Sequence, residues 1–159
     1  MSVGLLVGEV GEGPYFFELD EFSFFVHSFF STISYNLEPF GWGSSYPYLL
    51  KKLYYGKSLE GREIKKARKE LKRIKKIFEV LPPNRIIWDI EDLTKKPPWG
   101  DNPGPKVTNL ANYFITEYGV TFFEVFHEAF KDAEDTKSNV LIHSIDDSDE
   151  ELYFRVMLR

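Results

Sequence analysis

The chain has 159 residues, of which 43% are apolar, with a formal net charge of −5 and no cysteine. This size and composition suit one globular domain with a full core. The absence of cysteine excludes disulfide scaffolds, thiolate zinc sites and cysteine nucleophiles. No segment has the ~20 apolar residues that span a bilayer, and the N-terminus lacks the basic flank of a signal peptide. We therefore expect a cytoplasmic protein, or one exported without a classical signal, that does not act at a membrane.

The charge is unevenly distributed along the chain. Residues 60–79 carry nine Lys or Arg and four Glu, a balance of +5, so the remainder carries −5 minus +5, or −10. An acidic body suits a basic partner and disfavours nucleic acid, because it repels phosphates. Within the basic segment, Glu63 and Glu70 dilute the positive face. That pattern is more typical of a solvated helix than of a nucleic-acid site.

The N-terminal part predicts a hairpin followed by a helix. Residues 2–10 and 15–19 have strand composition and flank a glycine-rich turn at 11–14. Asp20 is a good N-cap residue, and Pro39 ends the helix that follows. The apolar residues of that helix share one face; they are Phe22, Val26, Phe29, Phe30, Ile33 and Leu37.

Two further helices are predicted after a loop at residues 40–47. A short one covers residues 48–55, and Ser58 can cap the next. The second is the basic segment, which has an apolar stripe typical of a helix lying on a core. The stripe consists of Ile64, Ala67, Leu71, Ile74 and Phe78.

The second half of the chain alternates strands, loops and one helix. Residues 85–90 and 112–116 have strand composition and are separated by a long proline-rich loop, a kind of loop that is often functional. Thr121 and Glu124 have the spacing of a capping box that opens a helix. A strand at 140–145 and a closing strand within 151–158 complete the expected elements.

The resulting order, β-β-α-α-α-β-β-α-β-β, lacks regular βαβ alternation. It favours an α+β fold in which a mainly antiparallel sheet is covered by three to four helices in a single domain. Within it, we expect residues 1–145 to form the main body and residues 146–159 an acidic turn with the closing strand.

An acidic cluster at Asp89, Glu91 and Asp92 allows two interpretations. In a continuing strand Asp89 and Glu91 would point to the same face, where carboxylates could hold Mg²⁺ in a metal-dependent hydrolase. Alternatively the acids are structural or face a partner, which is common for surface carboxylates. The three histidines, His27, His127 and His143, have no metal-ligand spacing, so we expect boundary residues rather than ligands or bases.

Two tryptophans lie beside glycines in predicted loops. Trp42 stands between Gly41 and Gly43, and Trp99 precedes Gly100. Each ring could fold back over the core, or it could anchor a protein interface, where Trp contributes much of the binding energy. Stiff proline-rich backbone next to Trp99 favours a recognition loop, because less conformational entropy is lost on binding.

Several motifs occur in a recognisable order. They are HSFFSTISYNLE at 27–38, WGS and YPYL within 42–49, IWDIEDL and PPWG within 87–100, and NYFIT at 112–116. Together they resemble the immunity protein 70 family of bacterial polymorphic toxin systems, over about residues 1–145.

This resemblance implies an α+β protein that binds the toxin domain made by the same cell and so prevents self-killing. It implies no catalysis and no cofactor, and it transfers no contact residues. From the sequence itself we expect Trp42 and Trp99 to act as anchors, with Glu91, Asp92 and Asp101 as charge partners. The acidic body suits a basic toxin, such as a nuclease.

Overall fold

The computed structural model describes residues 1–8, 14–146, 154–156 and 158, and it contains one five-stranded sheet. The strand order is β3-β4-β1-β2-β5. All neighbouring pairs are antiparallel except β2 with β5, which is parallel. The strands are β1 Ser2–Val7, β2 Tyr15–Asp20, β3 Ser58–Leu59, β4 Val140–Ile145 and β5 Phe154–Val156.

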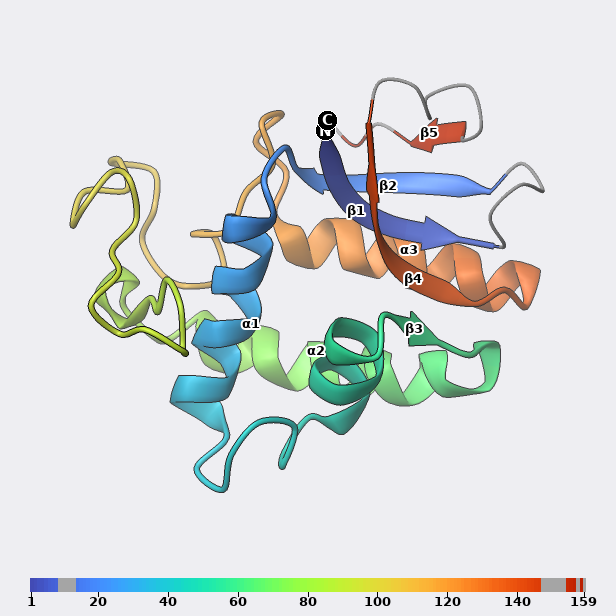
Figure 1. Cartoon of the computed structure of the whole chain (residues 1–159), viewed down its shortest axis with the longest axis horizontal. Coiled ribbons are helices and arrows are strands. Elements are labelled where there is room, and N and C mark those ends of the chain that lie inside the picture. Colours follow the sequence, from blue (N-terminus) through green and yellow to red (C-terminus); the bar gives the residue numbers. More distant parts are fainter. Residues whose placement is uncertain (9–13, 147–153, 157, 159) are drawn as a thin grey trace.

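The helices form layers against this sheet (Figure 1). α3 packs on β1, β2 and β4, α2 packs on α3, and α1 contacts β2 and the π-helix. Among the described residues, no helix combines the length and the apolar content needed to cross a membrane. The helices are α1 Ser23–Leu37, the π-helix Tyr48–Tyr55, α2 Ile64–Phe78, α3 Phe122–Thr136, and short 3₁₀ helices at Gly61–Glu63 and Pro83–Arg85.

Phenylalanine rings hold the layers together. Phe29 of α1 is fully buried and lies 5.5 Å from Phe126 of α3, 5.2 Å from Phe114 and 6.3 Å from Phe78 of α2, measured between ring centroids. Such edge and offset ring contacts are favourable beyond the area they bury. On the opposite face of β1, Leu6 belongs to a second, smaller hydrophobic cluster.

The sequence-based fold class is confirmed: this is an α+β domain with a mainly antiparallel sheet. The N-terminal hairpin, the apolar stripe of α2, and α3 with its Thr121–Glu124 capping box are all present. A closing strand is also found, at Phe154–Val156, and most of the remaining residues of the expected range 151–158 lie outside those that the structure describes. The expected turns at 11–14 and 146–150 lie largely outside the described residues.

Several local predictions are wrong. Asp20 does not cap α1, because it still pairs with Val3 in the sheet and the helix begins only at Ser23. Ser58 belongs to β3, and Glu60 caps the following 3₁₀ helix instead.

The strand expected at residues 112–116 is also absent. It is replaced by a tight turn in which Thr116 N donates to Val120 O at 2.8 Å and Phe122 N to Phe114 O at 2.8 Å. Both bonds join residues within the segment 114–122, so its backbone groups are bonded without a separate neighbouring strand.

Candidate interaction site

Residues 86–118 form a long loop region beside α1, at the left of Figure 1. The strand expected at 85–90 is not formed, because side chains of α1 bond the backbone that a neighbouring strand would bond. Thr32 Oγ1 accepts from Ile87 N at 3.0 Å, and Ser28 Oγ donates to Ile87 O at 2.8 Å. Ser31 Oγ accepts from Ile90 N at 3.2 Å. These bonds fix the loop to α1 and satisfy the backbone N–H and C=O of Ile87 and the N–H of Ile90.

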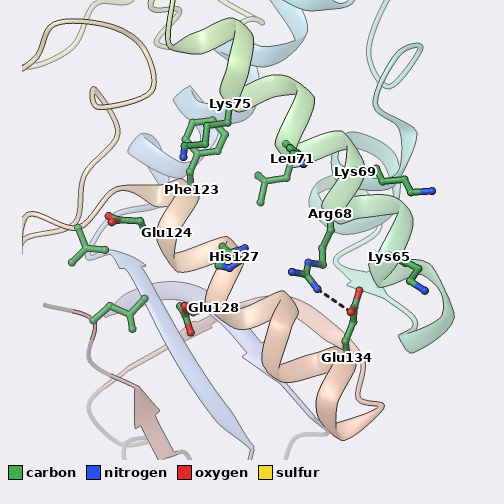
Figure 2. Close-up of a pocket in the computed structure, with 13 residues that line it drawn as sticks. Lys65, Arg68, Lys69, Leu71, Lys75, Phe123, Glu124, His127, Glu128 and Glu134 are labelled. Atoms are coloured by element: carbon green, nitrogen blue, oxygen red, sulfur yellow. Dashed lines mark hydrogen bonds and ion pairs between the residues drawn. The ribbon is translucent and has the colours of Figure 1, made fainter.

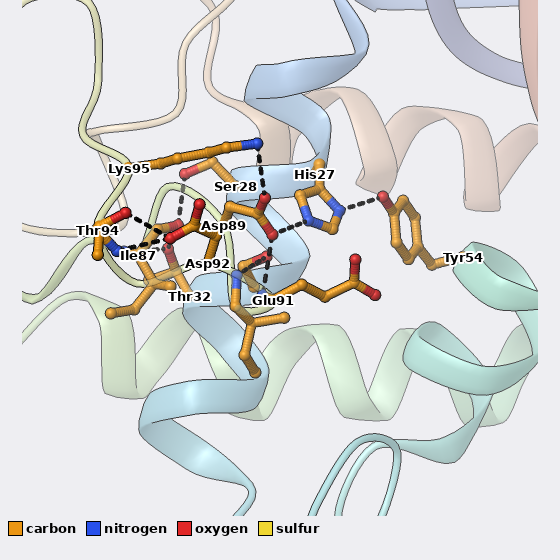
Figure 3. A network of polar contacts seen from close by, with 12 residues as sticks. His27, Ser28, Thr32, Tyr54, Ile87, Asp89, Glu91, Asp92, Thr94 and Lys95 are labelled. Carbon is orange, nitrogen blue, oxygen red and sulfur yellow. Dashed lines mark hydrogen bonds and ion pairs between the residues drawn. The ribbon is translucent and has the colours of Figure 1, made fainter.

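Asp89 lies at the centre of a polar network that joins three segments (Figure 3). Its Oδ1 lies 2.9 Å from His27 Nε2 and accepts from Glu91 N at 2.9 Å, while Lys95 Nζ lies 3.5 Å from Oδ2. The other ring nitrogen of His27 lies 2.6 Å from the Tyr54 hydroxyl. His27, expected to be a boundary residue, therefore links α1 to both the loop and the π-helix.

The electrostatics of this network favour an ionised Asp89 and a neutral Tyr54. The hydrogen bond from His27 lowers the pKa of Asp89, with further help from Glu91 N and Lys95. Burial raises the pKa of Tyr54 to about 12, and the nearby charges of Glu91 and Asp89 add to the effect. A phenol with a raised pKa is a poor nucleophile. The arrangement fixes the position of the loop relative to α1 and the π-helix.

The acidic cluster does not fit the metal-hydrolase interpretation. Because the segment is a loop, the two-residue alternation that would align Asp89 with Glu91 does not apply. Asp89 is engaged by His27 and Lys95, and Asp92 Oδ1 accepts from Thr94. Across the part of the chain that the structure describes, no group of three or more His, Asp or Glu side chains could hold a metal ion.

Trp99 lies at the surface but is held rigidly. Its side chain is 39% exposed, and Nε1 donates to the Tyr113 hydroxyl at 2.7 Å. Its ring meets Phe25 edge-on at 5.4 Å and Trp88 edge-on at 5.6 Å. A partner that covers the exposed part would therefore immobilise little that is not already ordered. Asp101, two residues later, is exposed.

Trp42 is half-buried, and its indole serves the fold. Nε1 donates to Leu50 O at 2.9 Å, and the ring lies 5.7 Å from that of Tyr54. Positive φ angles of 104° at Gly41 and 76° at Gly43 turn the backbone around it, a conformation that glycine adopts readily. Since Tyr54 also contacts His27, a chain of contacts links Trp42 to the Asp89 network.

A hollow of about 790 Å³ lies between α2 and α3 (Figure 2). Basic side chains of α2 line one wall, and Glu124, Glu128 and Glu134 of α3 line the other. Arg68 Nη1 donates to Glu134 Oε2 at 2.9 Å across it. Because both signs of charge line the hollow, it does not select an anionic partner.

A groove of about 500 Å³ lies where β2 leads into α1, facing residues 98–118. Its wall includes the exposed rings of Phe22, Phe24 and Trp99. Carboxylates, among them Glu21 and Glu117, also line it. Apolar surface beside charge of one sign is typical of an interaction surface.

A family model described as Immunity protein 70 matches residues 8–142 of this chain. The chain belongs to the immunity protein 70 family. No curated protein and no solved structure gave a match in the same comparisons. The family match includes α1, the loop region and the groove, whereas β5 lies beyond it.

For this member of the immunity protein 70 family, the sequence identified only part of the surface around Trp99. It placed Glu91, Asp92, Trp99 and Asp101 on one loop, as the structure does. The aromatic groove residues were missed, because helical periodicity assigned Phe22 to the core, whereas its side chain is mostly exposed. The available signal was Phe24, an aromatic residue off the apolar stripe and two residues after the N-cap of α1, Phe22.

Proposed function

We propose that this protein neutralises a cognate bacterial toxin domain by one-to-one binding in the cytoplasm of the producing cell, without catalysis of its own. The observation that carries this proposal is the immunity-family match over residues 8–142.

The proposed contact surface is the loop face, which consists of Glu91, Asp92, Trp99 and Asp101 together with Trp42. Contacts through Tyr54 and His27 connect Trp42 to the loop. Glu91 and Asp101 are exposed, and Asp92 is half-buried. A rigid, partly exposed indole on the same loop as these acids combines an anchor with charge that attracts a basic partner. The toxin would accordingly present a basic surface, as nucleases do.

Co-expression with the toxin encoded beside this gene tests the proposal. We expect cells to survive when both proteins are made, and the purified pair to elute as a one-to-one complex by light scattering. Continued killing by that toxin in cells that contain the folded protein would overturn the proposal.

The loop face itself is tested with Trp99→Ala and with the double variant Glu91→Lys and Asp92→Lys. Each is expected to weaken binding by about tenfold or more, as loss of an anchor or of complementary charge does. Tyr55→Ala serves as a control, because Tyr55 is highly exposed on the π-helix. If both loop-face variants bind as tightly as the wild type, the contacts lie elsewhere.

A further inference from the structure

The groove at the junction of β2 and α1 is an apolar surface with an ordered floor. Five of its side chains are between 38% and 61% exposed: Phe22, Phe24, Trp99, Ile115 and Tyr118. The rings of Phe22 and Phe24 lie 6.2 Å apart in a stacked arrangement. Beneath them, Phe25 contacts Trp88, Trp99 and Tyr113, with ring centroids 5.4–6.4 Å apart. A partner that covered these exposed rings would bury apolar surface and lose little conformational entropy, because the residues beneath them are already packed.

Of the charged residues that the structure describes, only acids border the groove. Glu18, Asp20, Glu21 and Glu117 line it, and among the described residues that do so there is no Lys, Arg or His. Burial raises the pKa of Asp20, and the neighbouring charges of Glu21 and Glu18 act in the same direction. In contrast to Asp89, which has His27 and Lys95 beside it, these carboxylates are not offset by a cation in the groove wall.

We infer that this groove receives a segment of the toxin in which an apolar side chain is flanked by Lys or Arg. The apolar side chain would pack between Phe24 and Trp99, while the flanking cations would approach Glu21 and Glu117. This division matches the usual anatomy of interfaces, with an apolar centre and a polar rim. The acids exclude an anionic occupant such as nucleic acid, because they would repel its phosphates. The inference rests on the proposed neutralisation and specifies where, and by what chemistry, the toxin binds.

The test measures affinity for the catalytically inactivated toxin domain by biolayer interferometry. Phe24→Ala is expected to raise the dissociation constant by about 30-fold, the effect of losing an interface hot spot. The double variant Glu21→Lys and Glu117→Lys is expected to raise the dissociation constant by about tenfold or more. Both changes are at exposed positions, so the urea midpoint should stay close to that of the wild type. If Phe24→Ala does not fold, Phe22→Ala and the charge variant provide the same information.

Matched controls place equivalent changes elsewhere on the molecule. Phe40→Ala removes a ring that is 91% exposed beyond the opposite end of α1. Glu79→Lys with Asp135→Lys changes the net charge by the same amount at exposed positions outside the groove. Both controls should bind within about twofold of the wild type.

The outcomes separate the two proposals. Loss of binding in the groove variants but not in the controls supports the groove as the docking site. If the wild type binds and rescues cells while the groove variants bind equally well, the groove is not the site but neutralisation still stands. If the wild type neither binds nor rescues, neutralisation of this toxin is overturned and the groove assignment with it.

Discussion

Two buried carboxylates hold the backbone around Trp42. Glu38 accepts hydrogen bonds from three N–H groups of residues 43–46 at 2.9–3.0 Å. Glu70 of α2 accepts from the first two residues of the π-helix Tyr48–Tyr55 at 2.9 and 3.3 Å. Bonds of this kind satisfy the orphan donors at a helix N-terminus. Single acids therefore determine how the loop carrying Trp42 joins the helices.

Glu70 should make stability depend on pH. Burial raises its pKa from 4.5 to about 7, with Glu38 adding to the shift and the two backbone N–H bonds opposing it. Between these values the folded protein binds more protons than the unfolded chain, so the free energy of unfolding falls as pH rises. We expect this residue to remove about 1–3 kcal/mol between pH 4.5 and 7.5, measured by urea denaturation across that range. In Glu70→Gln this part of the slope should vanish; an unchanged slope would contradict the assignment.

Among the helices and strands, the sequence correctly predicted those features that depend on residues close together in the chain. The apolar stripe of α2 follows helical periodicity, and the Thr121–Glu124 capping box that opens α3 involves residues three apart. The segment 85–90 has strand composition but bonds to side chains of α1, about 55–59 residues away. Strand composition indicates extended backbone and does not indicate what that backbone will pair with.

The candidate site likewise has one part that local sequence indicates and another part that depends on contacts between distant segments. The sequence could propose the acids and Trp99 as a contact surface because they lie close to one another in the chain. The groove was not predicted, because it combines β2, the start of α1 and residues 98–118, which only the tertiary fold brings together.

The attachment of the loop to α1 can be tested at Thr32. Its fully buried hydroxyl accepts from Ile87 N and donates to Ile87 O. Thr32→Val keeps the shape but leaves that N–H without its acceptor, so we expect a loss of about 1–3 kcal/mol in unfolding free energy. Urea denaturation followed by tryptophan fluorescence measures this loss, since Trp88 and Trp99 both lie in the loop region.

Thr136→Val is the matched control for this change. Its exposed hydroxyl at the end of α3 donates to Asp132 O, and its loss should cost no more than about 0.5 kcal/mol. Equal effects of the two substitutions would show that the loop does not depend on the Thr32 hydroxyl.

The whole molecule separates its charges. The basic helix α2 packs on the side of α3 away from the sheet (Figure 1), whereas the acidic groove lies where β2 leads into α1. With +5 on residues 60–79 and −10 on the rest, the chain has a dipolar surface rather than a uniformly acidic one. A basic toxin would be drawn toward the groove side and repelled from α2, which orients the encounter before contact.

Steering of this kind makes the association rate depend on salt. We expect the rate constant for binding the inactivated toxin domain to fall by about tenfold or more between 50 and 500 mM NaCl, with a much smaller change in dissociation, because screening weakens long-range attraction most. Stopped-flow mixing measures both. An association rate that does not vary with salt would exclude electrostatic steering.

Two charge variants distinguish local steering from an effect of net charge. Glu21→Lys with Glu117→Lys and Glu79→Lys with Asp135→Lys each reverse two acids and therefore take the net charge from −5 to −1. If the potential around the groove guides the toxin, only the first pair should strongly slow association and flatten its salt dependence. Equal slowing by both pairs would mean that total charge, rather than its position on the molecule, sets the encounter rate.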